Sequence, residues 1–579
     1  MIRKLAVYIG EYKRWALLAP VLVILEVICE IIMPRLMASI VDVGIKYSDM
    51  GHILRVGGLM LALAALGMVC GVGAAKAAST AGQGFGANLR QAMFEKIQDF
   101  SFADIDRFSS ASLITRTTND VNNIQLMFTM GMRIVTRAPV MLVAALFMAF
   151  SINASLAAIL VVVIPVMVIA IGGIMRVSSH LFTLMQQRID NLNNTVQEDL
   201  VAIRVVKAFV REGYERTRFQ KANDELTQAG IRVAMRITMI MPIMTLCLNG
   251  ATLAVLYRGG NLVMGGAMEY GALSSFIGYI FQILMSVMLV AMSLLQMSRA
   301  QASASRILEV LETQPDIQDR PGSEKAVLPA AKGRVEFRDV AFKYRASGTG
   351  DDVLKDIDFV AEPGQFVAIV GGTGTGKSSL VNLIPRFYDV TGGEVLVDGM
   401  DVRDYPMEAL RRRIGMVLQN NVLFSGTIRE NLLWGNKNAT EEEMIQAAKN
   451  AQAYDFIMAF PDGFDTKLEQ GGVNVSGGQK QRLCIARALL KKPSILIMDD
   501  STSAVDSHTE ALIRESFHND LKDTTVIIIA QRISSVRYAD KILVLDDGVI
   551  AGEGTHDELM ASNAIYQEIY HSQQEGVSD

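Results

Sequence analysis

The residues with the clearest chemistry form a glycine-rich stretch that fits the pattern G-x-x-x-x-G-K-[ST]. An apolar run, Phe366 to Val370, leads into it and a helical segment follows, so a strand and a helix flank the loop. Glycines let such a loop turn its N–H groups toward a phosphate. Lys377 is expected to reach the β- and γ-phosphates, and the Ser378 hydroxyl to ligate Mg²⁺. The predicted nucleotide-binding residues of the loop are Gly371, Gly372, Thr373, Gly374, Thr375, Gly376, Lys377, Ser378 and Ser379.

Polar side chains end three other apolar runs, which span 414–418, 495–498 and 526–530. These side chains are Gln419, the pair Asp499 and Asp500, and Gln531. A carboxylate at such a strand end orients Mg²⁺ and its waters, and an amide oxygen can reach the same ion. The sequence therefore predicts a metal site made of Ser378, Gln419 and Asp499.

A second candidate anion contact lies where Asn474–Gln479 precedes a helical pattern that continues to Leu490. A serine and two glycines at a helix start leave free N–H groups that can face an anion. The predicted contacts are Ser476, Gly477, Gly478 and Gln479. Farther upstream, residues 334–344 alternate like an antiparallel strand that ends at Tyr344.

Apolar residues make up 50% of the 579 and are concentrated in the N-terminal half. Runs near membrane-spanning length cover 16–33, 57–78, 138–152, 155–175, 238–257 and 275–296. So many long runs favour membrane helices over the core of a soluble protein. A net charge of −5 gives no sign of a nucleic-acid partner. The four cysteines are isolated, and three of them lie in apolar runs, which suits buried thiols better than a disulfide or a metal site.

The basic residues set the predicted orientation. They gather between the second and third runs and between the fourth and fifth, so both segments and both chain termini are expected in the cytosol. Each segment is predicted to form a helical hairpin that reaches about 35–40 Å below the bilayer, with tips near 110–120 and 205–215. Residues 1–14 are expected to form an interfacial helix.

Two glutamates, Glu26 and Glu30, lie one helical turn apart within the first apolar run. An ionisable group at that depth is costly and usually faces a protein interior or a water-filled cavity. The pair could bind a cationic or polar substrate, or titrate during transport. Alternatively, one carboxyl is protonated, or pairs with Arg35 or with a neighbouring helix.

The order Tyr344, GGTGTGKSS, Gln419, VSGGQ, LIMDD, SAVD and Gln531 resembles the nucleotide-binding domain of ATP-binding-cassette exporters. The six spans before it resemble half-transporters of the multidrug-resistance type, so the resemblance covers essentially the whole chain. It implies a six-helix, all-α transmembrane domain with long cytosolic hairpins, followed by an α/β P-loop domain with a helical signature subdomain. The expected boundaries are 1–312 for the first domain, 313–332 for a linker and 333–579 for the second.

The resemblance also implies roles for single residues. Tyr344 would stack on adenine, residues 503–506, ending at Asp506, would form the D-loop, and the hairpin tips would be coupling helices. ATP and Mg²⁺ would be held between the P-loop of one subunit and the signature of the other.

Two positions depart from the family pattern. The residue after the metal-binding aspartate is usually Glu and is Asp500 here, and the usual histidine after the last strand is Gln531. A misplacement of roughly 1 Å can lose about 100-fold in rate, and glutamine has no titrating imidazole. These departures predict a catalytic position that binds ATP and hydrolyses it poorly, while the intact VSGGQ completes the site of a non-identical partner.

The chain is therefore expected to be one subunit of a heterodimeric exporter in a bacterial plasma or inner membrane, with its nucleotide-binding domain in the cytoplasm. Its expected substrates are hydrophobic or amphipathic compounds. The alternatives are a homodimeric lipid or peptide exporter of the same fold and an ATP-gated channel.

Overall fold

The computed structural model describes residues 2–323, 326–344, 352–500 and 505–575. The chain divides into two compact units. The first holds Met1–Ile97 and Ala111–Thr313, and the second holds Gln98–Ser110 and Gln314–Asp579. The short segment Gln98–Ser110 therefore belongs with the C-terminal part of the chain.

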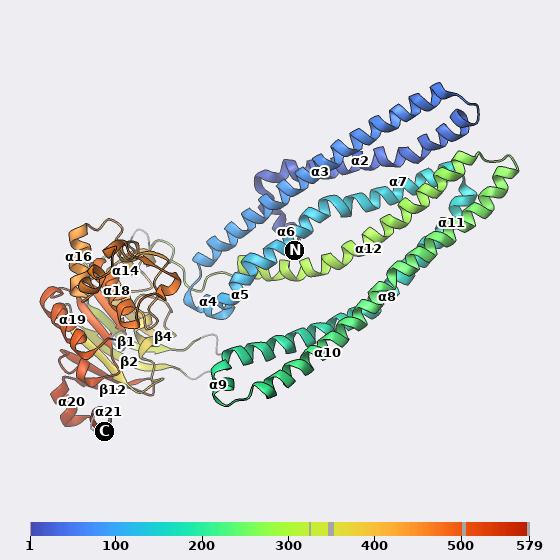
Figure 1. Cartoon of the computed structure of the whole chain (residues 1–579). Coiled ribbons are helices and arrows are strands. Elements are labelled where there is room, and N and C mark those ends of the chain that lie inside the picture. Colours follow the sequence, from blue (N-terminus) through green and yellow to red (C-terminus); the bar gives the residue numbers. More distant parts are fainter. Residues whose placement is uncertain (1, 324–325, 345–351, 501–504, 576–579) are drawn as a thin grey trace. The chain divides into compact units, whose positions relative to one another are not determined.

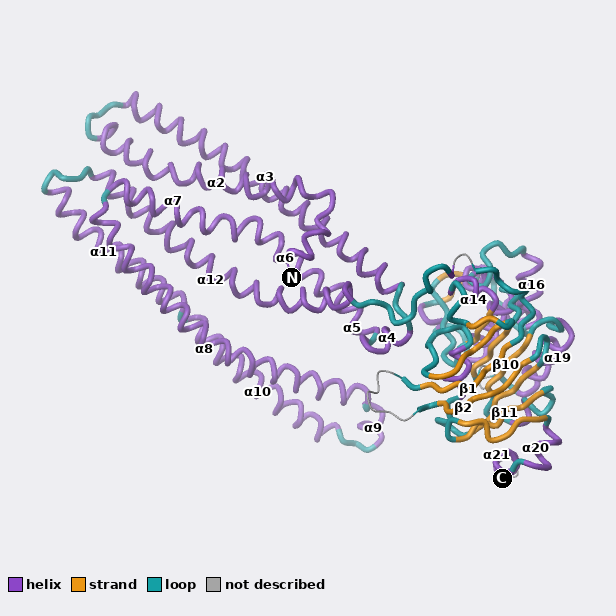
Figure 2. The backbone as a smooth tube through the Cα atoms, turned by 180° about the vertical axis from the view of Figure 1, so that it is seen from behind, coloured by secondary structure: helices purple, strands orange, loops and turns teal. Residues whose placement is uncertain are grey.

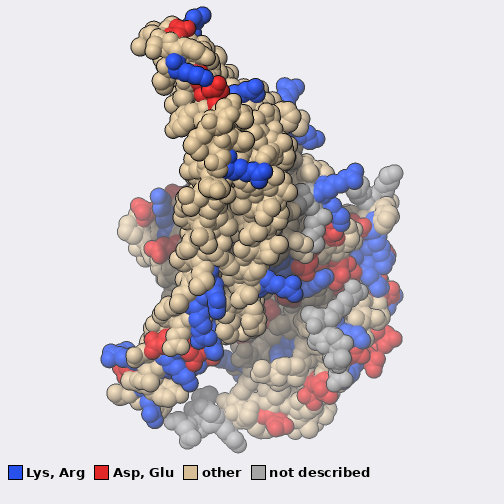
Figure 3. Space-filling model, turned by 90° about the vertical axis from the view of Figure 1, so that its right-hand side faces the viewer, with Lys and Arg blue, Asp and Glu red and all other residues tan. Residues whose placement is uncertain are grey.

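The first unit is built of long helices, and the described residues contain 6 that are long and apolar enough to cross a membrane. They are Arg3–Ile45, Met50–Gln98, Ser110–Ile152, Ala154–Val201, Glu212–Met264 and Tyr270–Ala291. All six predicted spans are confirmed, and the helix that contains the third run begins well before it, at Ser110. Uncharged side chains cover most of the helical surface in Figure 3, as a lipid-facing surface requires.

The helices of this unit pack as long neighbouring rods (Figure 1). Two pairs, α2 with α3 and α8 with α10, lie side by side in both views (Figures 1 and 2). The bounds are α1 (Ile2–Leu5), η1 (Ala6–Tyr12), α2 (Lys13–Ser39), η2 (Ile40–Ile45), α3 (Met50–Gln98), α5 (Ser110–Thr115), η3 (Arg116–Asp120), α6 (Val121–Met130), η4 (Gly131–Val135), α7 (Thr136–Ile152), α8 (Ala154–Val201), α9 (Ile203–Ala208), α10 (Glu212–Thr238), α11 (Ile240–Met264) and α12 (Tyr270–Glu312). The short elements η2, η3 and η4 are π-helical.

Polar contacts join α12 to the helices beside it. The Tyr279 hydroxyl of α12 donates to the backbone carbonyl of Ile31 in α2 at 2.9 Å. Toward the C-terminal end of α12, Arg306 forms an ion pair with Asp120, whose side chain is buried. The first contact gives the Tyr279 hydroxyl a partner that lipid cannot provide, and the second pairs a buried carboxylate with a guanidinium.

The turn of the first hairpin comes earlier than the sequence predicted. Helix α3 ends at Gln98 and α4 spans Phe102–Phe108, so the chain reverses before residue 110. Ser101 and Asp104 form a capping box that starts α4, and Ser109 adopts φ of 58°, which ends it. The second turn, between α8 and α10, overlaps the predicted 205–215.

The second unit contains a mixed sheet and a smaller antiparallel sheet (Figure 2). The six-stranded sheet has the order β12-β11-β3-β10-β9-β6, in which only the edge strand β12 runs antiparallel to its neighbour. Its inner strands are buried along their length, as the apolar runs predicted. The antiparallel sheet has the order β2-β1-β4-β5, and a short pair, β7-β8, lies apart.

The strands are β1 (Val335–Phe342), β2 (Leu354–Ala361), β3 (Phe366–Gly371), β4 (Gly392–Val397), β5 (Met400–Asp401), β6 (Ile414–Val417), β7 (Gly426–Thr427), β8 (Lys467–Leu468), β9 (Ile495–Asp499), β10 (Thr525–Ile529), β11 (Lys541–Asp546) and β12 (Val549–Gly554). The helices are α13 (Lys377–Leu383), α14 (Met407–Arg413), α15 (Ile428–Leu433), α16 (Glu441–Asn450), α17 (Tyr454–Met458), α18 (Gly477–Leu490), α19 (Ser507–Asp520), α20 (His556–Ser562) and α21 (Ala564–Glu575). The predicted fold class, a six-helix membrane domain before an α/β domain, is confirmed.

Candidate nucleotide site

The order of the strands places the predicted site residues at one edge of the sheet. Strands β3, β10, β9 and β6 are consecutive neighbours and run parallel, so their carboxyl ends meet at that edge. The four chain segments that leave this edge carry the glycine-rich loop, Gln531, the two aspartates and Gln419. Ligands of open α/β sheets bind outside the carboxyl ends of the strands, which fits this arrangement.

The glycine-rich loop depends on backbone conformations that glycine adopts readily. Gly374 and Gly376 have φ of 87° and 94°. A Cβ atom at Gly376 would come within 2.8 Å of the Leu354 side chain. The loop curls around the Lys377 ammonium, which donates to the carbonyl oxygens of Gly371 and Gly372 at 2.9 and 2.5 Å. Burial lowers the pKa of Lys377. A partly buried ammonium in such a loop suits a phosphate.

Two of the predicted metal ligands are in contact. The Ser378 hydroxyl donates to Asp499 Oδ1 at 3.0 Å, across the gap between α13 and the end of β9. Asp499 is buried, and burial raises the pKa of its carboxyl above the ordinary value. A buried carboxylate beside a hydroxyl favours a divalent cation, because the cation stabilises the charged form. Ser378 and Asp499 would hold Mg²⁺ here, with Gln419 from the end of β6.

The two positions that depart from the family pattern touch each other. The Gln531 amide donates through Nε2 to Asp500 Oδ2 at 2.6 Å. Asp500 also has φ of 46°, an uncommon value for an aspartate. Burial raises the pKa of its carboxyl, while hydrogen bonds from Gln531 and Gln419 and the charge of Lys377 oppose that shift. The carboxylate is therefore engaged by side-chain amides, a contact that the sequence motifs do not reveal.

Tyr344 lies beside the loop, at the end of β1. Its hydroxyl is 2.8 Å from the Ser379 hydroxyl, and its ring packs edge-on against Phe342 and Tyr388, with centroids 4.9 and 5.2 Å apart. The ring is thus held upright next to α13. This position suits the predicted stacking on adenine.

The same aromatic cluster contacts α4, which the motifs did not predict. The Tyr388 hydroxyl donates to Asp106 Oδ2 at 2.8 Å, and the rings of Phe102 and Phe387 lie 4.4 Å apart. Burial raises the pKa of Tyr388, and the bond to Asp106 adds to that shift. The side chains of α4 therefore reach residues that surround Tyr344. Only the aromatic pair Phe387-Tyr388, a few residues after the loop helix, could have indicated such a contact.

The signature residues start a helix of their own. Ser476 and Gln479 form a reciprocal capping box, in which the Ser476 N–H donates to Gln479 Oε1 at 2.9 Å and the Gln479 N–H donates to Ser476 Oγ at 3.3 Å. Ser476 and Gly477 are exposed, which a segment that serves another subunit requires. Asp506 caps α19 by accepting from the Thr509 N–H at 2.9 Å. The preceding D-loop positions, 503 and 504, lie outside the described residues.

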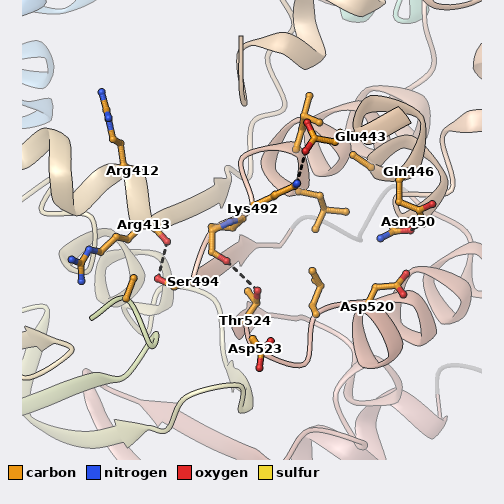
Figure 4. Close-up of a pocket in the computed structure, with 16 residues that line it drawn as sticks. Arg412, Arg413, Glu443, Gln446, Asn450, Lys492, Ser494, Asp520, Asp523 and Thr524 are labelled. Carbon is orange, nitrogen blue, oxygen red and sulfur yellow. Dashed lines mark hydrogen bonds and ion pairs between the residues drawn. The ribbon is translucent and has the colours of Figure 1, made fainter. Parts of the chain in front are cut away.

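A different cavity of about 670 Å³ lies among α16, α18 and α19 and the start of β9 (Figure 4). Glu443 and Lys492 form an ion pair of 2.5 Å across it. None of the predicted nucleotide-binding residues lines it. The cavity is therefore separate from the candidate nucleotide site.

Comparisons with known proteins agree with this geometry. Residues 16–287 match the family of the ABC transporter transmembrane region, and residues 354–503 match the ABC transporter family. An uncharacterized ABC transporter ATP-binding protein of Mycobacterium tuberculosis is 40% identical over 98% of this chain and 97% of its own length. The chain belongs to the ABC transporter family. It is a half-transporter, because one transmembrane domain precedes one ATPase domain.

Other relatives place this ABC transporter among exporters. The structure of a bacterial Atm1-family ABC exporter with ATP bound has a TM-score of 0.80 and 26% identity, and the match covers 97% of this chain and 99% of that one. An ATP-dependent lipid A-core flippase of Syntrophus aciditrophicus is 34% identical over 85% of this chain and 81% of its own length. A fatty acid ABC transporter ATP-binding/permease protein of Mycobacterium tuberculosis is 36% identical over 83% and 75%, respectively.

Proposed function

We propose that this chain is one subunit of a heterodimeric, ATP-driven exporter of hydrophobic or amphipathic compounds in a bacterial membrane. Its own P-loop binds Mg-ATP but hydrolyses it slowly, and its signature completes the competent site of a non-identical partner. The observation that carries this proposal is the hydrogen bond between Gln531 and Asp500.

The residues at the sheet edge have two different tasks. Lys377, Ser378 and Asp499 bind nucleotide and metal, and all three keep the family's residue types. Hydrolysis also needs a base that receives a proton from the attacking water, within hydrogen-bond reach of it. Asp500 is one methylene shorter than the usual glutamate, and the Gln531 amide occupies one of its oxygens. Binding of Mg-ATP is therefore retained, while removal of the proton from the attacking water is impaired.

Isotope-labelled nucleotide tests this proposal in the purified complex. The complex should contain a second, non-identical half-transporter, and one ATP per complex should stay unhydrolysed through many turnovers. Replacing the partner's catalytic glutamate with glutamine should abolish turnover. A complex of two identical copies of this chain that hydrolyses ATP at the rate of the native transporter would refute the heterodimer.

The alternative is a homodimeric exporter of lipids or fatty acids. The names of two relatives, a lipid A-core flippase and a fatty acid transporter, favour it. This alternative requires that Asp500 act as the catalytic base in both sites, because no second kind of subunit supplies a glutamate. Native mass spectrometry of the complex from its own membrane decides between one and two kinds of subunit.

A further inference from the structure

The C-terminal helix α21 holds the chain segment that follows strand β10. Gln573 of α21 bridges two backbone groups of that segment with its side-chain amide. Its Nε2 donates to the Gln531 carbonyl at 2.7 Å, and its Oε1 accepts from the Ile533 N–H at 2.9 Å. These bonds join residues that are 42 and 40 positions apart, so they are tertiary contacts and not part of a local turn. Gln573 therefore fixes the backbone on both sides of Arg532.

The segment takes one of its hydrogen-bond partners from outside. The short 3₁₀ helix η9 spans Ile533–Ser535, and the residue before it, Arg532, forms no side-chain cap. The first N–H groups of a helix have no acceptor within that helix. Gln573 supplies the acceptor for the Ile533 N–H, so the start of η9 is tied to α21.

Helix α21 is itself anchored in the core of the second unit. Tyr566 is fully buried, and Ile569 and Tyr570 pack against the same apolar core as Ile533. Tyr566, Ile569, Tyr570 and Gln573 follow the spacing i, i+3, i+4 and i+7, so they share one face of the helix. Gln573 is thus the polar end of an apolar face, and a packed helix presents it to the segment.

Gln531 connects this clamp to the nucleotide site. Strand β10 lies between β3 and β9, so Gln531 emerges between the glycine-rich loop and Asp499, where the terminal phosphate and Mg²⁺ would lie. The Gln531 amide has two N–H groups. One donates to Asp500 at 2.6 Å, and the other can donate to a phosphate oxygen. A hydrogen bond tolerates a displacement of roughly half an ångström, so both contacts depend on where the Gln531 backbone lies.

We infer that Gln573 is a positioning residue of the nucleotide site: it holds Gln531 where its amide reaches the terminal phosphate, and so makes the site prefer ATP to ADP. This inference deepens the proposed function and rests on it for the binding of Mg-ATP, but it does not require a second kind of subunit. Gln573 acts through Gln531.

The test compares two nucleotides on the purified full-length chain. The imido analogue of ATP and ADP, both with Mg²⁺, displace fluorescent trinitrophenyl-ATP. Gln573→Met keeps the length of the side chain but removes both hydrogen bonds. It should weaken binding of the ATP analogue about fivefold, or about 1 kcal/mol, which is the size of one hydrogen bond, and leave binding of ADP unchanged. Gln573→Ala replaces it if the methionine variant does not fold.

The same helix offers a matched control. Gln567 also donates through Nε2 to a backbone carbonyl, that of Met560, at 2.7 Å, but this contact lies within α20 and α21. Gln567→Met should leave the preference for ATP unchanged.

Limited proteolysis reports the segment directly. Arg532 is exposed, and trypsin cleaves the bond between Arg532 and Ile533, which lies between the two groups that Gln573 holds. Gln573→Met should speed release of the fragment that begins at Ile533 several-fold, and Gln567→Met should not.

Four results would overturn the inference. They are an unchanged preference for ATP in Gln573→Met, equal weakening of both nucleotides by that variant, the same loss of preference in Gln567→Met, and unchanged cleavage after Arg532. In each case nucleotide binding by the wild type leaves the proposed function intact. A wild-type chain that binds neither nucleotide would refute the proposed function itself, and the inference with it.

Discussion

Restoring the two departing residues together should restore hydrolysis at this chain's own P-loop. In the wild type the Gln531 amide lies 2.6 Å from Asp500 Oδ2, so the two side chains fill the space between the ends of β9 and β10. Asp500→Glu alone pushes a longer carboxylate against that amide. Adding Gln531→His replaces the amide with an imidazole, which the family uses at this position.

The expected gain in hydrolysis rate follows from the position of the Asp500 carboxylate. The missing methylene displaces it by about 1 Å or more, and such a displacement costs roughly 100-fold in rate. The double variant should therefore hydrolyse ATP about 100-fold faster at this site. Each single variant should gain less than about tenfold, because residues in direct contact have non-additive effects.

The assay is single-turnover hydrolysis of Mg-ATP by the chain purified without a partner, whose own signature can complete the site in trans. Affinity for Mg-ATP is measured in parallel and should stay constant, since Lys377 and Ser378 are unchanged. Lys377→Ala in the double variant is the control that loses binding. A wild-type chain that turns over at a rate close to that of the double variant, with equal binding, would contradict the reasoning.

Three further substitutions test separate contacts. Tyr388→Phe removes the hydroxyl that donates to Asp106, which should lower the free energy of unfolding by about 1 kcal/mol. It should also lower transport more than ATPase activity, and equal losses of the two would show that this contact does not couple ATP hydrolysis to transport. Asp120→Asn leaves a buried amide in place of the ion pair with Arg306, and we expect the free energy of unfolding to fall by about 1–3 kcal/mol. Chemical denaturation in detergent measures this change, and unchanged stability would show that the ion pair does not stabilise the fold. Gly376→Ala should abolish Mg-ATP binding in a filter assay, because φ is 94° there, and retained affinity would show that the loop can relax.

The sequence predicted where the candidate site residues lie in the fold when local patterns determine their positions. Apolar runs that end in polar residues mark the carboxyl ends of buried parallel strands, so Asp499 and Gln419 could be assigned to one sheet edge. Contacts between distant segments could not be predicted in this way. The ion pair between Arg137 and Glu26 joins residues that are 111 positions apart, and no periodicity connects them. The Tyr388–Asp106 bond spans 282 residues and likewise depends on tertiary packing.

The first hairpin shows how local and global signals differ. Its tip was predicted from the length of the basic segment, and that estimate fell about ten residues too late. The capping residues give the correct place, since Ser101 and Asp104 satisfy each other's backbone N–H groups at the start of α4. A short helix that is fixed by its own cap can be positioned from sequence, whereas the length of a long helical segment does not say where it turns.

The contacts within the second unit suggest a mechanical use for the proposed slow site. Nucleotide that binds and persists stabilises the bound state by about 2.7 kcal/mol when its concentration is 100 times the dissociation constant. Tyr344 contacts Tyr388, and Tyr388 contacts Asp106 of α4, so an adenine on Tyr344 would be two side chains away from that helix. A site that holds ATP would thus maintain the contacts between Tyr344, Tyr388 and α4 while the competent site releases ADP and binds new ATP. Under the proposed function, slow hydrolysis at Asp500 would let ATP shift the population of one state without being consumed.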